Sequence, residues 1–264
     1  MTFVIALLLA LLPLPQPAAP ARINDKEVKD LFDRIDNDRD RFEDQLDSSV
    51  KHAVLRGPAG EVDVEKFLDD LQENVDKLKG RFSDSYNAGS EVATVLRQGT
   101  AVQRYMATQP PALKGMSEWN KLAVSLGMLA GAYGTTFPTP DDAAPRRLGD
   151  GQVADAAVQT ANAADQFKKQ LDAALKMDKT FSLANRKAAV AEAEGLKKDA
   201  DELADRVKDN KPASAEATQL FARAQRIQTA AASMPLTPDA KAAWESVVRP
   251  LSTVAEGFNV APLR

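Results

Sequence analysis

The chain has 264 residues, of which 44% are apolar and 27% charged, and its formal net charge is −4. It contains no cysteine and one histidine, which excludes disulfides and zinc sites built from the usual cysteine and histidine ligands. A mildly acidic chain without a basic block is also a poor partner for nucleic acid.

The first predicted element is an export signal at residues 1–21. Residues 2–12 are almost wholly apolar, prolines follow, and the triplet Ala19-Pro20-Ala21 offers the small-residue pattern that a signal peptidase recognises. An apolar run this short cannot cross a bilayer, which needs roughly 20 residues. We therefore predict cleavage near Ala21, export to the periplasm or the medium, and no membrane span in the mature chain.

Residues 22–134 are predicted to form four helices, because their apolar residues recur in steps of three and four throughout. The Gly-Pro-Ala-Gly segment at 57–60 and the prolines at 110–111 break this pattern. No stretch alternates apolar and polar residues over strand-like lengths. In the last helix, the small residues of the segment 127–131 predict close packing inside the bundle.

Capping signals mark several helix starts. Asn24 precedes Glu27 in the spacing of a capping box. Ser117 and Thr237 stand near the starts of the two tryptophan-containing helices, and Pro238 suits a first helical turn because its missing N–H costs nothing there.

Residues 135–150 are rich in proline and are predicted to be a linker, and residues 151–264 repeat the helical spacing. A shift of 125 residues aligns 28–134 with 153–259 without a gap, and about one aligned position in five is identical. The predicted fold class is therefore all-α, with two tandem up-down-up-down four-helix bundles that arose by internal duplication and that follow a signal peptide.

Polar residues shared by the two copies are candidate sites. Asp47 and Arg81 lie on successive predicted helices, which suggests an inter-helix ion pair that Asp172 and Arg206 repeat. Such pairs commonly set the register of a bundle. The functional alternative is one ligand site in each copy.

Aromatic residues are also repeated at the same spacing. Phe42 corresponds to Phe167, and Trp119 corresponds to Trp244. An aromatic residue one turn into the last helix of a bundle is usually part of the core. We therefore predict a repeated aromatic core and no recognition surface at these positions.

The chain shows no catalytic arrangement. His52 is the single histidine, and the acidic run at 36–40 lacks the glycine and glutamate that a calcium loop requires. We predict no catalytic residue, no metal site and no cofactor, and hence no enzyme. The predicted function is that of an exported protein of the bacterial cell envelope with an interaction or scaffold role towards an unknown protein partner. The alternative is a carrier of a small ligand or a haem-like cofactor in a bundle-core pocket.

Overall fold

The computed structural model describes residues 22–52, 54–57 and 60–263. The predicted export signal, residues 1–21, lies outside this part of the chain. Where the chain is described it is predominantly helical, as the apolar spacing predicted. None of these helices combines the length and the apolar character needed to span a bilayer.

The N-terminal helical group comprises residues 25–132. Its elements are α1 (Asp25–Gln45), α2 (Ser48–Lys51), β1 (Val54–Gly57), β2 (Gly60–Asp63), α3 (Val64–Arg81), α4 (Gly89–Met106) and α5 (Met116–Ala132). The predicted capping box opens α1, since the Asn24 side chain accepts the Glu27 N–H while the Glu27 carboxylate accepts the Asn24 N–H.

The C-terminal helical group comprises α6 (Asp150–Met177), α7 (Leu183–Lys208), α8 (Ser214–Ala231) and α9 (Pro238–Gly257). As predicted, Thr237 caps α9 by accepting the N–H of Ala240, and Pro238 is its first residue. Ser117 lies one residue inside α5, so it does not occupy the capping position.

The main departure from the predicted elements is a short hairpin after α1. The sequence predicted no break in the helical pattern before residue 57, but α1 ends at Gln45, and α2 and the antiparallel strands β1 and β2 follow. Each strand has only four residues, which is too short for an alternating pattern to be recognised. In the C-terminal group no such break occurs, and α6 continues to Met177.

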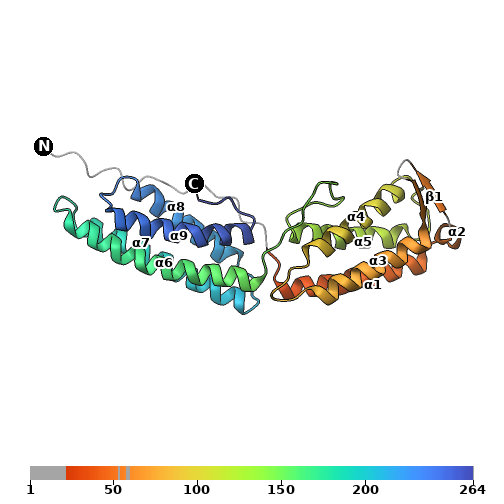
Figure 1. Ribbon diagram of the computed structural model, residues 1–264, viewed down its shortest axis with the longest axis horizontal. Helices are drawn as coiled ribbons and strands as arrows, with labels where there is room; N and C mark the ends of the chain where they lie inside the picture. Colours follow the sequence, from red (N-terminus) through yellow and green to blue (C-terminus); the bar gives the residue numbers. More distant parts are fainter. Residues whose placement is uncertain (1–21, 53, 58–59, 264) are drawn as a thin grey trace.

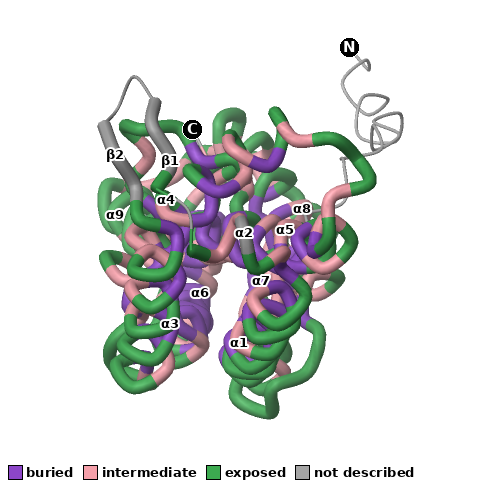
Figure 2. Tube along the Cα trace, turned by 90° about the vertical axis from the view of Figure 1, so that its right-hand side faces the viewer, coloured by how far each residue is buried: buried purple, intermediate pink, exposed green. Residues whose placement is uncertain are grey.

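Each helical group encloses its own hydrophobic core, and the two groups lie one after the other along the long axis of the molecule (Figure 1). Figure 2 shows that the buried residues lie on the inward sides of the helices. The core of the N-terminal group runs from Val28 to Tyr133, and that of the C-terminal group runs from Val153 to Phe258.

The segment between α5 and α6 packs on the N-terminal group. The N–H of Thr139 donates to the hydroxyl of Thr100, and the side-chain amide of Asn87 donates to the carbonyl of Arg147, both at 2.9 Å. Phe137 packs against the core of the same group. The predicted linker therefore fixes the start of α6 close to the N-terminal group.

Candidate functional site

The predicted ion pair between Arg81 and Asp47 is wrong, because Arg81 has a different partner. Arg81 pairs with Glu91 at 2.6 Å. Lys29, near the start of α1, pairs with Asp84, which follows the end of α3, so the two helices run antiparallel. Asp47 follows the end of α1, and its carbonyl oxygen accepts the N–H groups of Val50 and Lys51 in α2. Asp47 and Arg81 therefore lie at opposite ends of the helix pair.

The second predicted pair is also replaced by other partners. Arg206 pairs with Glu216 at 2.9 Å, and Asp172 accepts two hydrogen bonds from Arg186 at 2.6 and 2.9 Å. The pairs Arg81–Glu91 and Arg206–Glu216 occupy positions 125 residues apart. The signal for these partners was present in the sequence, because both glutamates belong to the residues shared at that spacing.

Several contacts keep Glu91 ionised. Its burial acts to raise the pKa, but hydrogen bonds from Ser90 and Tyr86 and the positive charge of Arg81 outweigh this effect and lower the pKa. A lowered pKa in the folded state means that Glu91 contributes stability above the ordinary glutamate pKa, and that this stability is lost as the pH falls through the folded-state value.

We expect Glu91→Gln to reduce the acid sensitivity of the fold. The difference between the free energies of unfolding at pH 7 and pH 3 should be smaller in the variant than in the parent protein, as measured by urea denaturation. Arg81→Met should reduce the pH dependence less, since the charge of Arg81 is only one of the causes of the lowered pKa. Its side chain is 64% exposed, and such a pair contributes at most about 1 kcal/mol at pH 7. An unchanged pH dependence in Glu91→Gln would contradict the assignment.

The aromatic residues predicted for the repeated core are in contact within each helical group, but only one of the two pairs is fully enclosed. The ring centroids of Phe42 and Trp119 lie 5.4 Å apart, and those of Phe167 and Trp244 lie 5.1 Å apart. Trp119 is 1% exposed and donates its indole N–H to Gln103 at 2.8 Å, whereas Trp244 is only half-buried.

A cavity of about 530 Å³ adjoins Trp244 at the surface between α8 and α9. Its apolar lining includes Leu236, Val248 and Leu263, and its rim carries Lys241 and Glu245. It lies outside the core of the C-terminal group, so it is not the bundle-core pocket that the carrier hypothesis predicted.

Metal-binding residues are not grouped in the described residues, where no set of three His, Cys, Asp or Glu side chains could hold an ion. His52 is exposed, and its Nδ1 lies 3.1 Å from a carboxylate oxygen of Glu65. The acidic run at 36–40 lies inside α1, where successive side chains point in different directions.

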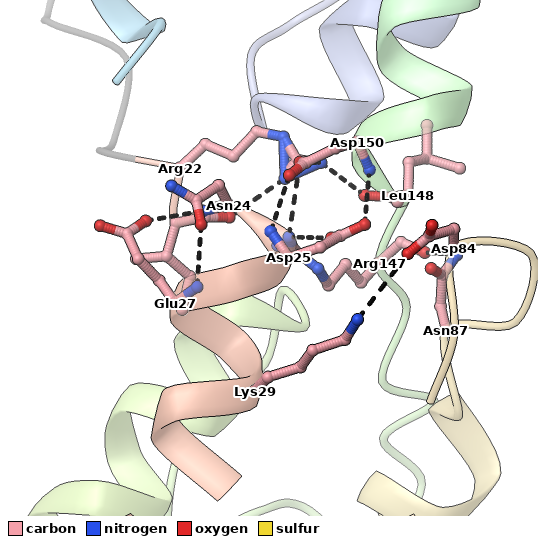
Figure 3. A network of polar contacts seen from close by, with 12 residues as sticks. Arg22, Asn24, Asp25, Glu27, Lys29, Asp84, Asn87, Arg147, Leu148 and Asp150 are labelled. Atoms are coloured by element: carbon pink, nitrogen blue, oxygen red, sulfur yellow. Dashed lines mark hydrogen bonds and ion pairs between the residues drawn. The ribbon is translucent and has the colours of Figure 1, made fainter. Parts of the chain in front are cut away.

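A buried network of charges joins the two helical groups (Figure 3). Asp25 and Asp150 are the first residues of α1 and α6. The Asp25 N–H donates to the carboxylate of Asp150 at 2.7 Å, and the Asp150 N–H donates to the carboxylate of Asp25 at 2.9 Å. Each carboxylate thus binds the N-terminus of the other helix, where negative charge is favourable.

Two arginines complete this network, and each lies before one of the two helices and pairs with the aspartate of the other. Arg22 pairs with Asp150, and Arg147 pairs with Asp25, both at 2.6 Å. The arginine side chains are only 7% and 3% exposed. Arg22 and Arg147 are 125 residues apart, as are Asp25 and Asp150. We call these four residues the junction network.

The junction network was not predicted from the sequence, although a signal for it existed. The gapless alignment began at residue 28, and extending it upstream by six residues aligns Arg22 with Arg147 and Asp25 with Asp150. Their burial, however, depends on how the two helical groups meet, and one sequence does not reveal this.

Desolvation exceeds the charge attraction at one pair of the network. Burial, aided by the charge of Arg147, lowers the pKa of Arg22 to about 10, although Asp150 and Asp25 oppose this shift. Burial likewise raises the pKa of Asp150. Among the described residues, no acceptor lies within hydrogen-bond distance of the buried Nε–H groups of Arg22 and Arg147. The ionised Arg22–Asp150 pair therefore stabilises the fold weakly, as is common for buried ion pairs.

The outer face of α5 is the second distinctive feature of the structure. Val124 and Met128 are 66% and 44% exposed, and a Cβ atom added at Gly127 or Gly131 would meet no atom within 4 Å. Gly127 and Gly131 therefore do not pack closely inside the bundle as predicted, although Leu129 and Ala130 of the same segment are buried. Other residues form the buried side of α5, namely Trp119, Leu122, Leu126 and Leu129.

The outer face of α9 provides a direct comparison. The residues 125 positions further along the chain are Arg249, Ser252, Thr253 and Glu256. These four are polar where α5 carries Val124, Gly127, Met128 and Gly131. Solvent thus meets an apolar face on α5 and a polar face on α9.

A second cavity, of about 490 Å³, continues the α5 face towards the junction between the helical groups. One side is formed by the end of α5, including Met128 and Gly131, and by Arg146 of the following segment. Glu256 and Asn259, at the end of α9, form part of the other side. The cavity is therefore lined by both helical groups.

Comparison with protein-family models, with curated proteins and with solved structures finds no match to this chain.

Proposed function

We propose that the chain is an exported, non-enzymatic scaffold protein of the bacterial cell envelope, which binds a protein partner through the outer face of α5. We further propose that it consists of two four-helix bundle units, residues 22–134 and 151–264, joined by the linker 135–150 and derived from one duplicated ancestor. Export rests on the sequence of residues 1–21.

Contacts at matching positions support the duplication. The ion pairs of Arg81 and Arg206, the aromatic pairs of Trp119 and Trp244, and the reciprocal junction network all recur at a spacing of 125 residues. Coincidental similarity between alanine-rich helices would not place equivalent contacts at equivalent positions.

The contrast between α5 and α9 carries the proposed interaction role. In duplicated units, α9 shows the polar surface that a solvent-facing helix normally has. The same surface of α5 lacks these charges and carries Val124 and Met128, which are exposed. An exposed apolar face on one of two related helices indicates a surface that is covered in a complex.

We expect the double variant Val124→Arg, Met128→Thr to lose its partner while it retains its fold, because both new residues occur naturally at the matching positions of α9. The measurement is cross-linking in the exporting cell followed by mass spectrometry of the products. Met177→Thr is the matched control, since Met177 is a 75% exposed methionine at the end of α6. Equal cross-linking of the double variant, the control and the parent protein would contradict the proposal.

A small-ligand carrier is the second candidate, favoured by the cavity beside Trp244. Native mass spectrometry of the exported protein separates the two functions and also tests export. A measured mass that equals that of a chain beginning at Arg22, with no bound molecule, supports the exported scaffold. A bound small molecule that is lost in Trp244→Ala supports the carrier.

A further inference from the structure

The α5 face and the adjoining cavity form one continuous groove, because Met128 and Gly131 belong to both. We call it the junction groove. Glycines at 127 and 131 leave the floor flat, and Val124 and Met128 form ridges beside it. Ridges next to small residues suit the close packing of a second helix, whose side chains then fill the spaces over the glycines.

The charged side chains of the junction groove are mainly cationic. Its lining includes Arg22, Arg146 and Arg147 but only one acidic residue, Glu256. Arg22 and Arg147 are paired with aspartates of the junction network. The exposed Arg146 forms no ion pair within the described part of the chain, so its charge is available at this end.

A second arginine stands at the other edge of the groove. Arg34 of α1 is exposed, and its guanidinium lies 3.6 Å from the sulfur of Met128. Like Arg146, it makes no ion pair with any residue that the structure describes. Two cations thus flank an apolar floor on a chain whose net charge is −4.

We propose that the junction groove binds an amphipathic helix of a partner protein, with apolar residues against α5 and carboxylates that pair with Arg34 and Arg146. This inference rests on the proposed interaction role and specifies the partner's chemistry. Complementary charges at the rim of an interface select the partner and orient it. A lipid surface fits less well, since Val124 and Met128 are the only large apolar side chains of α5 that are exposed, and the groove is concave.

The test uses the full exported protein and two synthetic helical peptides of 18 residues. Both peptides carry the same alanine and leucine face, but one has glutamates along its flanks and the other has lysines. Fluorescence anisotropy should show that the glutamate peptide binds at least about tenfold more tightly than the lysine peptide. Equal binding of the two peptides, or binding of neither, would overturn the proposal.

Variants locate the binding and remove the remaining alternatives. The double substitution Arg34→Glu, Arg146→Glu should reverse the preference between the peptides, and Met128→Thr should weaken binding of the glutamate peptide while Met177→Thr does not. Circular dichroism verifies that each variant is folded. An unchanged preference in the double variant overturns the proposal. The proposal is also overturned if the protein binds vesicles of anionic lipid through Met128 but binds neither peptide.

Failure of this inference is distinguishable from failure of the proposed function. If Val124→Arg, Met128→Thr loses the cellular cross-links but the parent protein does not bind the glutamate peptide, the interaction role stands and the partner chemistry is wrong. If the cross-links persist in that variant, the interaction role itself is wrong.

Discussion

Trp119→Ala is expected to lower the free energy of unfolding by about 4 kcal/mol, the usual cost of removing a large buried aromatic side chain. Trp119 is 1% exposed, packs on Phe42, and donates a hydrogen bond to Gln103. The substitution removes the ring contact and leaves both a cavity and a glutamine without its donor. Trp244→Ala should cost only about half as much, because Trp244 is half-buried and its outer side lines a surface cavity.

The comparison needs a method that separates the two helical groups, since each has its own hydrophobic core and unfolding of the whole chain need not be a single transition. Hydrogen exchange measured by mass spectrometry provides this resolution. Trp119→Ala should accelerate exchange in α1, α3, α4 and α5 and leave α6–α9 nearly unchanged. Equal destabilisation by the two substitutions would show that the aromatic pairs are equivalent and that the difference in burial does not matter.

The helical fold could be predicted from the sequence because its causes are local. Apolar residues three and four positions apart place one face of a helix inward, and a capping residue marks where that helix begins. Asn24 and Thr237 therefore fix the starts of α1 and α9 in the structure as they do in the sequence. The short hairpin is an exception, since its strands are too brief to produce a pattern.

The pairing of side chains between helices could not be predicted in the same way. Asp47 and Arg81 were matched because both are shared between the copies, but the antiparallel course of α1 and α3 separates them. Arg81 instead meets Glu91 in the first turn of the next helix, α4. Which residues meet depends on helix direction and register, and these are properties of the packed structure.

The orientation of α5 shows a further limit of periodicity. Val124 and Met128 are apolar, as are the buried residues Leu122 and Leu126. A helix with apolar residues on both sides does not reveal from its own sequence which side is buried. The comparison with α9, in which the outer positions are polar, would have distinguished the two sides.

Arg147→Met is expected to lower the free energy of unfolding by about 3 kcal/mol, because it leaves the buried carboxylate of Asp25 without its cation. The equivalent substitution Arg22→Met should cost less. Burial lowers the pKa of Arg22 and raises the pKa of Asp150, and both shifts favour the uncharged forms. The loss of this pair therefore removes less charge attraction. Urea denaturation measures both losses, and a larger loss for Arg22→Met would contradict the asymmetry.

A double substitution separates the stability of the junction network from its effect on geometry. Arg147→Met with Asp25→Leu removes both charges, and we expect it to recover most of the stability, since a buried ion pair is often replaced by apolar residues without cost. It also removes the acceptor that binds the Asp150 N–H. Spin labels on α3 and α7 should therefore report a broader distribution of distances between the helical groups than in the parent protein. If the distribution remains as narrow as in the parent, the packed linker alone holds the two groups in position, and the junction network is not required for their orientation.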